Sequence, residues 1–168
     1  MNTIVLGNLV SLLGCTLMVA IGFIRKKESI LKVQCLQFGL LGTANLILGG
    51  ITGFISAIIS IIRNVVFAKW SSTVLMKAAF VIPQVLISAL ANASGFIGWL
   101  PILSTALFTW LIDTKDPVAF KLVLILTQLL WVVYDLWFLN YVAFTFDIFT
   151  ILANIISIMT ILKARRNP

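Results

Sequence analysis

Two asparagines lie deep inside long apolar stretches of this sequence, and their type suits them to bind a polar solute. Asn64 lies in the stretch 54–69 and Asn154 in the stretch 144–159, at the same position when the sequence is shifted by ninety residues. A side-chain amide offers both donors and an acceptor, and an unsatisfied polar group in hydrocarbon is costly. Facing each other, the two amides would bind a hydroxylated or zwitterionic solute. The alternative is that each only holds neighbouring helices together.

Three charged residues in apolar segments are further candidates. Asp135 and Asp147 are carboxylates in such segments, and a charge inside a membrane span marks a functional position by default. They would take up a proton coupled to transport or attract a cationic solute, unless they are interfacial residues hydrated from outside. Arg63 would bind an anion or pair with a carboxylate. Alternatively, its long side chain reaches the boundary near Lys69, about 9 Å away at about 1.5 Å per residue.

Aromatic residues and one further amide complete the candidate set. Trp131 and Trp137 belong to a stripe that repeats every three residues and would stack on a planar or sugar-like solute. Trp137 is also near the expected outer surface, where aromatic residues need no ligand, whereas Trp131 lies too deep for that role. Asn45 is the ninety-residue counterpart of Asp135. The predicted substrate-binding residues are Asn64, Asn154, Trp131, Asp135, Asp147, Trp137, Asn45 and Arg63.

The rest of the composition argues against enzymatic chemistry. The chain has no histidine, which excludes an imidazole base or ligand, and its two cysteines, Cys15 and Cys35, fall in apolar segments. It has no Gly-rich phosphate loop followed by Lys, and neither Asp135 nor Asp147 has the Gly-Asp context of intramembrane aspartyl proteases. The sequence therefore predicts no enzymatic activity, no cofactor and no metal.

The elements that must position these residues are membrane helices. Hydrophobic residues make up 61% of the 168 residues and charged residues 10%, whereas a soluble domain is about half apolar and about a quarter charged. Because roughly 20 apolar residues cross a bilayer, nearly the whole chain is used for spans. We expect one all-α membrane domain over 1–168, with seven transmembrane helices at about 3–24, 30–48, 52–68, 72–92, 96–112, 118–139 and 141–162.

The connections alternate between the two sides of such a bundle, and the basic residues lie at the connections on one side. The connections after the first, third and fifth helices and the C-terminal end carry every Lys and Arg except Arg63, while the connections near 49–53, 92–95 and 140 carry none. The positive-inside rule then places the N-terminus outside and the C-terminus in the cytoplasm. Because the net charge of +7 is spread over helix ends, no nucleic-acid partner is expected.

A ninety-residue shift also relates the polar residues of the first three and the last three helices. Asn45 meets Asp135, Ser60 meets Thr150, and Asn64 meets Asn154. This predicts two parallel three-helix repeats, 3–70 and 96–163, joined by a linker helix at 72–94. SWEET-type transporters have this 3+1+3 arrangement, with the substrate site between the halves near the bilayer midplane.

Several short runs and spacings carry a family resemblance: Leu48-Gly49, Ser56-Ala57-Ile58, Ile62-Arg63, and Trp131, Trp137, Asp147 and Asn154 at their mutual distances. Along nearly its whole length the chain resembles the YgjV-type family of bacterial inner-membrane proteins. That family is in turn similar to the SWEET and PQ-loop solute transporters, in which an Asn from each third helix and a Trp from each second helix line the sugar site. The resemblance implies the same place for Asn64 and Asn154, with Trp137 or Phe138 as one Trp equivalent. The second Trp and the proline tetrad of that group have no counterpart here.

We therefore expect a small-solute membrane transporter or facilitator of the bacterial inner membrane, with a central cavity between the two repeats. The alternative is a non-transporting membrane scaffold or assembly subunit, in which the polar pairs only hold helices together. A continuous polar cavity would favour the first, and a dry, filled bundle the second. The expected partners are membrane lipid and a small polar solute, and the sequence leaves a homo-oligomer open.

Overall fold

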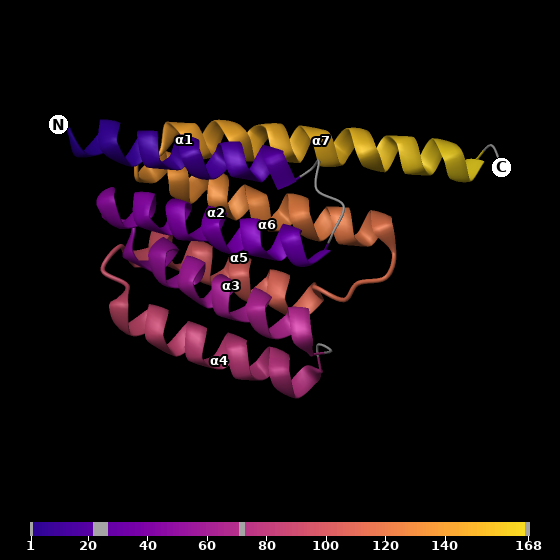
Figure 1. Ribbon diagram of the computed structural model, residues 1–168, viewed down its shortest axis with the longest axis horizontal. Coiled ribbons are helices and arrows are strands. Elements are labelled where there is room, and N and C mark those ends of the chain that lie inside the picture. Colours follow the sequence, from indigo (N-terminus) through magenta and orange to yellow (C-terminus); the bar gives the residue numbers. More distant parts are fainter. Residues whose placement is uncertain (1, 22–26, 71–72, 167–168) are drawn as a thin grey trace.

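Seven helices and no strand form the part of the chain that the structure describes. This computed structural model describes residues 2–21, 27–70 and 73–166. The helices lie side by side in one bundle, with the N-terminus and the C-terminus at opposite ends (Figure 1). They are α1 (Thr3–Ile21), α2 (Lys27–Ile47), α3 (Ile51–Lys69), α4 (Val74–Ala91), α5 (Gly95–Leu111), α6 (Pro117–Trp137) and α7 (Tyr141–Arg166).

The prediction of an all-α chain with seven helices is confirmed, and most boundaries agree to within a few residues. Local signals explain several of them. The side chain of Thr73 caps α4 by accepting from the Met76 N–H, and Asp116 caps α6 in the same way, as these residue types do at helix N-termini. The predicted end of the first helix at 22–24, the basic residues 25 and 26, and the predicted start of the fourth helix at 72 lie outside the described residues.

Five of the helices in the described ranges are long and apolar enough to cross a membrane, namely α1, α3, α4, α6 and α7. The α5 helix is apolar but has only 17 residues. The α2 helix has 21 residues, but Lys32, Gln34 and Gln37 make it more polar than the others. Both helices lie within the same bundle, because α2 packs on α1 and α3, and α5 packs on α3, α4 and α6.

Six of the helices pack in a closed ring. Along the ring α1 contacts α2, α2 contacts α3, α3 contacts α5, α5 contacts α6, α6 contacts α7, and α7 returns to α1. The α4 helix lies outside this ring, against α3 and α5, and forms one side of the bundle in Figure 1. In this arrangement side chains from all six helices can face the centre of the ring.

The distribution of side chains is inverted relative to a soluble protein. Large apolar residues such as Leu75 and Leu90 are 81% and 91% exposed, while polar residues such as Gln84 and Thr109 are fully buried. A soluble protein buries its large apolar residues and exposes its polar ones. The apolar exterior therefore fits lipid as the surrounding solvent, and the polar interior needs partners within the protein.

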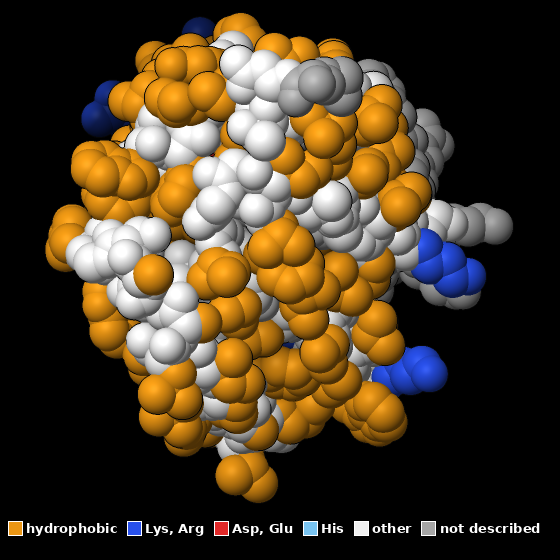
Figure 2. Space-filling view, turned by 90° about the vertical axis from the view of Figure 1, so that its left-hand side faces the viewer, with side chains coloured by type: hydrophobic (Ala, Val, Ile, Leu, Met, Phe, Trp, Pro, Cys, Tyr) orange, Lys and Arg blue, Asp and Glu red, His pale blue; other side chains and the backbone are white. Residues whose placement is uncertain are grey.

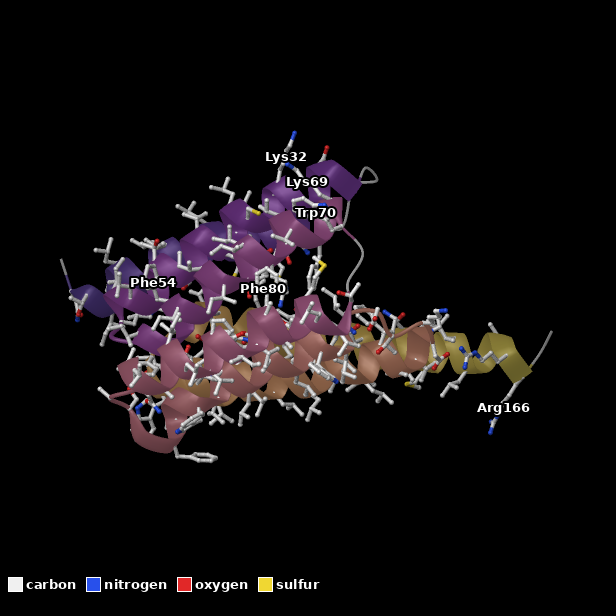
Figure 3. All side chains as sticks on the ribbon, turned by 90° about the horizontal axis from the view of Figure 1, so that it is seen from below. Lys32, Phe54, Lys69, Trp70, Phe80 and Arg166 are labelled. Atoms are coloured by element: carbon white, nitrogen blue, oxygen red, sulfur yellow. The ribbon has the colours of Figure 1, made fainter. Side chains whose placement is uncertain are left out.

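Exposed charged residues gather at one end of the bundle. Figure 3 shows Lys32, Lys69 and Arg166 pointing away from the helices at the end where α7 finishes. Figure 2 looks onto the opposite end, where apolar and uncharged side chains cover most of the face and basic side chains stand out only at its rim. The connections at that end, 48–50, 92–94 and 138–140, contain no charged residue.

Candidate functional site

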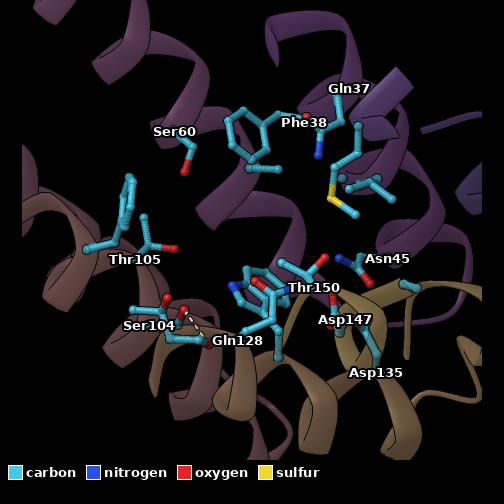
Figure 4. Close-up of a pocket in the computed structure, with 18 of the residues that line it drawn as sticks. Gln37, Phe38, Asn45, Ser60, Ser104, Thr105, Gln128, Asp135, Asp147 and Thr150 are labelled. Atoms are coloured by element: carbon cyan, nitrogen blue, oxygen red, sulfur yellow. Dashed lines mark hydrogen bonds between the residues drawn. The ribbon is translucent and has the colours of Figure 1, made fainter. Parts of the chain in front are cut away.

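A cavity of about 300 Å³ lies inside the ring of six helices. Each ring helix contributes side chains to it, and among the described residues α4 contributes none. Figure 4 shows amide, hydroxyl and carboxyl groups from several helices around this space. The polar residues of its lining are Gln34, Gln37, Asn45, Ser60, Arg63, Ser104, Thr105, Thr127, Gln128, Asp135, Asn140, Asp147 and Thr150.

Most of the predicted site residues line this one cavity. They are Asn45, Arg63, Trp131, Asp135 and Asp147. Four different helices, α2, α3, α6 and α7, bring them together. The structure thus gathers these five side chains from distant parts of the sequence, and their binding of a substrate stays a prediction.

The two carboxyl groups are buried without a cationic partner. Asp135 is 4% exposed and Asp147 is 7% exposed, and of the described residues no Lys or Arg forms an ion pair with either. Asp135 accepts a hydrogen bond from the Asn140 amide at 3.3 Å. One oxygen of Asp147 accepts from the Gln128 amide, whereas its Oδ2 atom is buried with no partner.

A second unpartnered acceptor lies on the same side of the cavity as these carboxyl groups. The Oδ1 atom of Asn45 is buried and accepts no hydrogen bond from the described residues. In Figure 4 Asn45, Asp135, Asp147 and Thr150 lie together on one side of the cavity. A buried acceptor without a donor is rare in native proteins and calls for an explanation. This side of the cavity therefore has two buried acceptors, Asn45 Oδ1 and Asp147 Oδ2, without a donor among the described residues.

Arg63 supplies a buried positive charge to the same cavity. It is 2% exposed, so its guanidinium group does not reach the surface near Lys69. It donates to the hydroxyl of Thr109 at 3.0 Å and to the Oδ1 atom of Asn64 at 3.1 and 3.3 Å, and it lies 5.0 Å from the centre of the Phe108 ring. Among the described residues no carboxylate forms an ion pair with it.

Asn64 and Asn154 are not among the residues that line this cavity, and their binding of a substrate stays a prediction. Asn64 is held between helices, where it accepts from Arg63 and donates to Gln34 on α2 at 3.2 Å. Asn154 donates to the Thr150 carbonyl at 2.9 Å and accepts from Lys121 on α6 at 3.4 Å. Neighbouring side chains thus satisfy both amides.

The two tryptophans have different surroundings. Trp131 lines the cavity and packs edge-on against Tyr134, with ring centres 5.6 Å apart. Trp137 is 64% exposed and does not line the cavity. It is the last residue of α6 and faces outward, which is the interfacial position that the sequence offered as its alternative. Trp137 therefore does not join the other predicted residues at this cavity, and its binding of a substrate stays a prediction.

Sequence reasoning missed several cavity residues, although a signal for them exists. Lining residues occur every three or four positions on α2 and again on α6, which is the spacing of one helical face. The two sets are also related by the ninety-residue shift. They are Gln34, Gln37, Phe38, Leu41 and Asn45 on α2, and Leu124, Thr127, Gln128, Trp131 and Asp135 on α6.

The comparison with known families covers the whole bundle. The chain matches a family model described as a bacterial inner membrane protein, Imp-YgjV, over residues 5–165. This range includes all the residues described above as lining the cavity. No curated protein and no solved structure matches the chain. The match over nearly the full length shows that the chain belongs to the Imp-YgjV family of bacterial inner membrane proteins.

Proposed function

We propose that the protein is a transporter or facilitator for a small polar solute, which binds in the cavity enclosed by the six ring helices. The observation that carries this proposal is a cavity with buried polar and charged side chains in its lining, inside an apolar bundle. Its volume of about 300 Å³ lies at the lower end of the range for small-molecule sites, about 300 to 1,000 Å³. A scaffold subunit gains nothing from buried charged groups around an unfilled space, because polar groups in a membrane are costly unless they serve a pathway.

The symmetry of the cavity supports a 3+1+3 architecture. Most of its described lining residues fall into nine pairs separated by ninety positions: 15 and 105, 18 and 108, 34 and 124, 37 and 127, 38 and 128, 41 and 131, 45 and 135, 57 and 147, and 60 and 150. The helix contacts follow the same relation, because α3 against α5 corresponds to α7 against α1. In this proposal α1–α3 and α5–α7 are the two repeats and α4 is the linker.

Two repeats around a shared cavity allow alternating access, in which one repeat rocks against the other. The contacts that join the repeats would then act as gates. At the end away from the basic residues, the Tyr134 hydroxyl of α6 accepts from the Gly53 N–H of α3 at 2.9 Å. At the same end the Asn8 amide of α1 donates to the Leu139 carbonyl at 2.8 Å, and its oxygen accepts from the Val142 N–H at 3.0 Å.

The same proposal takes all seven helices as membrane spans. The α2 helix buries its polar residues toward the cavity, since Gln34 and Gln37 line it and Leu36 on the opposite side is 58% exposed. The α5 helix is about 25 Å long at about 1.5 Å per residue, close to the roughly 30 Å of the hydrocarbon core. If all seven helices span the membrane with their basic ends inside, the N-terminus lies outside and the C-terminus in the cytoplasm.

Flux into proteoliposomes across a panel of small polar solutes tests the function. We expect Thr150→Trp, which fills the cavity, to abolish flux of a transported solute. Phe149→Trp on the same helix is the matched control, because Phe149 is 60% exposed and faces away from the cavity, and we expect it to keep flux. Flux that survives Thr150→Trp, or a panel with no flux at all, would contradict the proposal.

A further inference from the structure

We propose that the solute is a zwitterion, whose ammonium group binds at Asn45, Asp135 and Asp147 and whose anionic group binds at Arg63. This assignment rests on the proposed function, because it names the class of solute for the same cavity. It is carried by buried groups of opposite charge, Arg63 on one side and Asp135 and Asp147 on the other, which line one space and have no ion-pair partner among the described residues.

The acidic side of the cavity matches an ammonium group. The Oδ1 atom of Asn45 and the Oδ2 atom of Asp147 are buried without a donor, and the Asp135 carboxyl group lines the same side. An ammonium group has three N–H donors and no acceptor, so it offers one donor to each of these three residues. The Gln128 amide holds the other oxygen of Asp147 in place, and Asn140 does the same for Asp135.

The basic side of the cavity matches a carboxylate or another anion. Arg63 uses three of its N–H groups on Thr109 and Asn64, and a guanidinium group has five. The remaining donors have no carboxylate partner among the described residues. A buried charge without a counter-charge is strongly unfavourable, and an anionic group of the solute would remove this cost.

In the proposed 3+1+3 arrangement the two ends are separated along the membrane normal. Arg63 comes six positions after Ala57, which is the ninety-residue counterpart of Asp147, so the two side chains start from levels about 9 Å apart at about 1.5 Å per residue. A solute with one charge would leave the other end of the cavity uncompensated. An inorganic cation would also leave Arg63 without a partner. A solute that carries both charges satisfies both ends at once.

Thermal stabilisation of the purified protein in detergent tests the solute class without requiring transport. The probes are glycine and 4-aminobutanoate as zwitterions, butylamine and butanoate as matched single charges, and sodium chloride. We expect at least one zwitterion to stabilise the wild-type protein more strongly than either single-charge probe or sodium chloride at equal concentration. The inference is overturned if neither zwitterion stabilises it, or if butylamine, butanoate or sodium alone does so equally well.

Two variants at opposite ends separate recognition from general damage to the fold. For Arg63→Gln we expect the apparent affinity for the zwitterion, divided by that for butylamine, to fall by about tenfold. For Asp147→Asn we expect the apparent affinity for the zwitterion, divided by that for butanoate, to fall by the same factor. A merely structural role would weaken all probes alike and overturn the assignment. If Asp147→Asn does not fold, Asn45→Ala tests the same end.

The outcome for the solute class is separable from the outcome for transport. Zwitterion binding that requires both ends, combined with no flux of that zwitterion into proteoliposomes, would uphold the assignment and contradict the proposed function. Flux of an uncharged solute that Thr150→Trp blocks, with no response to either zwitterion, would uphold the proposed function and contradict the assignment.

Discussion

Gly49 and Leu139, ninety residues apart, occupy the same position in the same kind of turn. Both have a positive φ angle, +88° for Gly49 and +58° for Leu139. The residue that follows each donates its N–H back to the preceding helix, from Gly50 to Asn45 at 2.7 Å and from Asn140 to Asp135 at 2.8 Å. This is the Schellman ending of a helix. The second turn repeats the first with a residue that is poorly suited to the left-handed conformation.

This difference predicts opposite effects of two substitutions. A residue with a Cβ atom in the left-handed region costs about 1 to 2 kcal/mol. We therefore expect Leu139→Gly to stabilise the protein by about 0.5 to 1 kcal/mol, less than the full strain because glycine loses more backbone freedom on folding. We expect Gly49→Ala to destabilise it by about 1 kcal/mol. Thermal unfolding in detergent measures both, and a destabilised Leu139→Gly variant would contradict a shared turn geometry.

The hydroxyl of Tyr134 predicts a second stability effect. The side chain is fully buried, and its oxygen accepts from the Gly53 N–H at 2.9 Å and from the Thr52 hydroxyl at 3.3 Å. Tyr134→Phe leaves the Gly53 N–H unsatisfied near the start of α3, which costs about 1 to 3 kcal/mol. Tyr141→Phe makes the same chemical change at a residue that is 51% exposed. Equal unfolding temperatures for the two variants would argue against the Tyr134 contact.

The glycines around Tyr134 explain why this contact forms at all. A Cβ atom built on Gly50 would lie 2.5 Å from the Tyr134 oxygen, and one on Gly53 would lie 2.8 Å from its ring. The start of α3 can therefore approach the phenol closely only because these two residues have no side chain. The contact joins the two proposed repeats. Its loss would therefore also weaken the proposed closure of the cavity at this end.

The ion pair between Lys77 and Asp113 predicts a pH dependence of stability. Their side chains approach to 2.5 Å at the end of α5, and the hydrogen bond from Lys77 lowers the pKa of Asp113 below its usual value. An aspartate with a lowered pKa stabilises the fold above the pKa of the unfolded chain and loses that contribution as the pH falls. We expect stability to fall on acidification through about pH 4 and below.

Asp113→Asn is the control for this acid sensitivity. Because the Asp113 side chain is 55% exposed, solvent screens the pair, and we expect the loss to stay below about 1 kcal/mol. The variant should be less stable than wild type near neutral pH, and the difference should shrink as the pH falls. A constant difference across the acidic range would show that the ionised carboxylate does not contribute.

The fold was largely predictable because lipid imposes a simple pattern on sequence. Runs of about 20 apolar residues, the uncharged turn at Gly49 and the charged segment around Asp113 locate helices and connections without knowledge of their partners. The second helix was also predicted, at 30–48, although Gln34 and Gln37 make α2 more polar than the other helices. Both glutamines line the internal cavity. The sequence of one helix does not reveal such a cavity, because six helices form it.

The site was only partly predictable, because sequence gives the depth of a polar residue but not the direction of its side chain. Asp135 and Trp131 lie at cavity depth and point into the cavity. Asn64 and Asn154 also lie deep in their helices, but Gln34 and Lys121 on neighbouring helices bind them. The direction of each amide depends on which neighbouring helix packs beside it. The spacing of residues along one helix does not predict that neighbour.

The proposed orientation predicts a specific labelling pattern in intact bacteria. Ser94 lies in the uncharged connection between α4 and α5, and Lys163 lies in the basic last turn of α7. With the N-terminus outside, a membrane-impermeant maleimide should label Ser94→Cys in intact cells and Lys163→Cys only after the membrane is permeabilised. Cys15 is buried and the wild-type protein serves as the control for background labelling. The reverse pattern would invert the proposed topology.

The different partners of Asn64 and Asn154 predict unequal effects of the same substitution. Asn64→Ala removes the oxygen that accepts from the Nε and Nη2 atoms of Arg63, and a buried charged donor without a partner costs about 1.5 to 3 kcal/mol. Asn154→Ala removes a bond within its own helix and a long contact to Lys121. The Lys121 side chain is only partly buried, so water can replace that contact, and we expect a cost of about 1 kcal/mol or less.

Thermal unfolding in detergent measures the difference in stability between Asn64→Ala and Asn154→Ala. Flux into proteoliposomes measures the effect of each variant on the apparent affinity for a transported solute. Because Asn64 orients Arg63, we expect Asn64→Ala to lower the apparent affinity for a transported solute more than Asn154→Ala does. Asn64→Asp keeps the acceptor and adds a negative charge next to the guanidinium group, so it should restore stability. It should also weaken binding of an anionic group, because the new carboxylate competes for Arg63. Equal losses of stability and affinity for both alanine variants would show that Asn64 does not position Arg63.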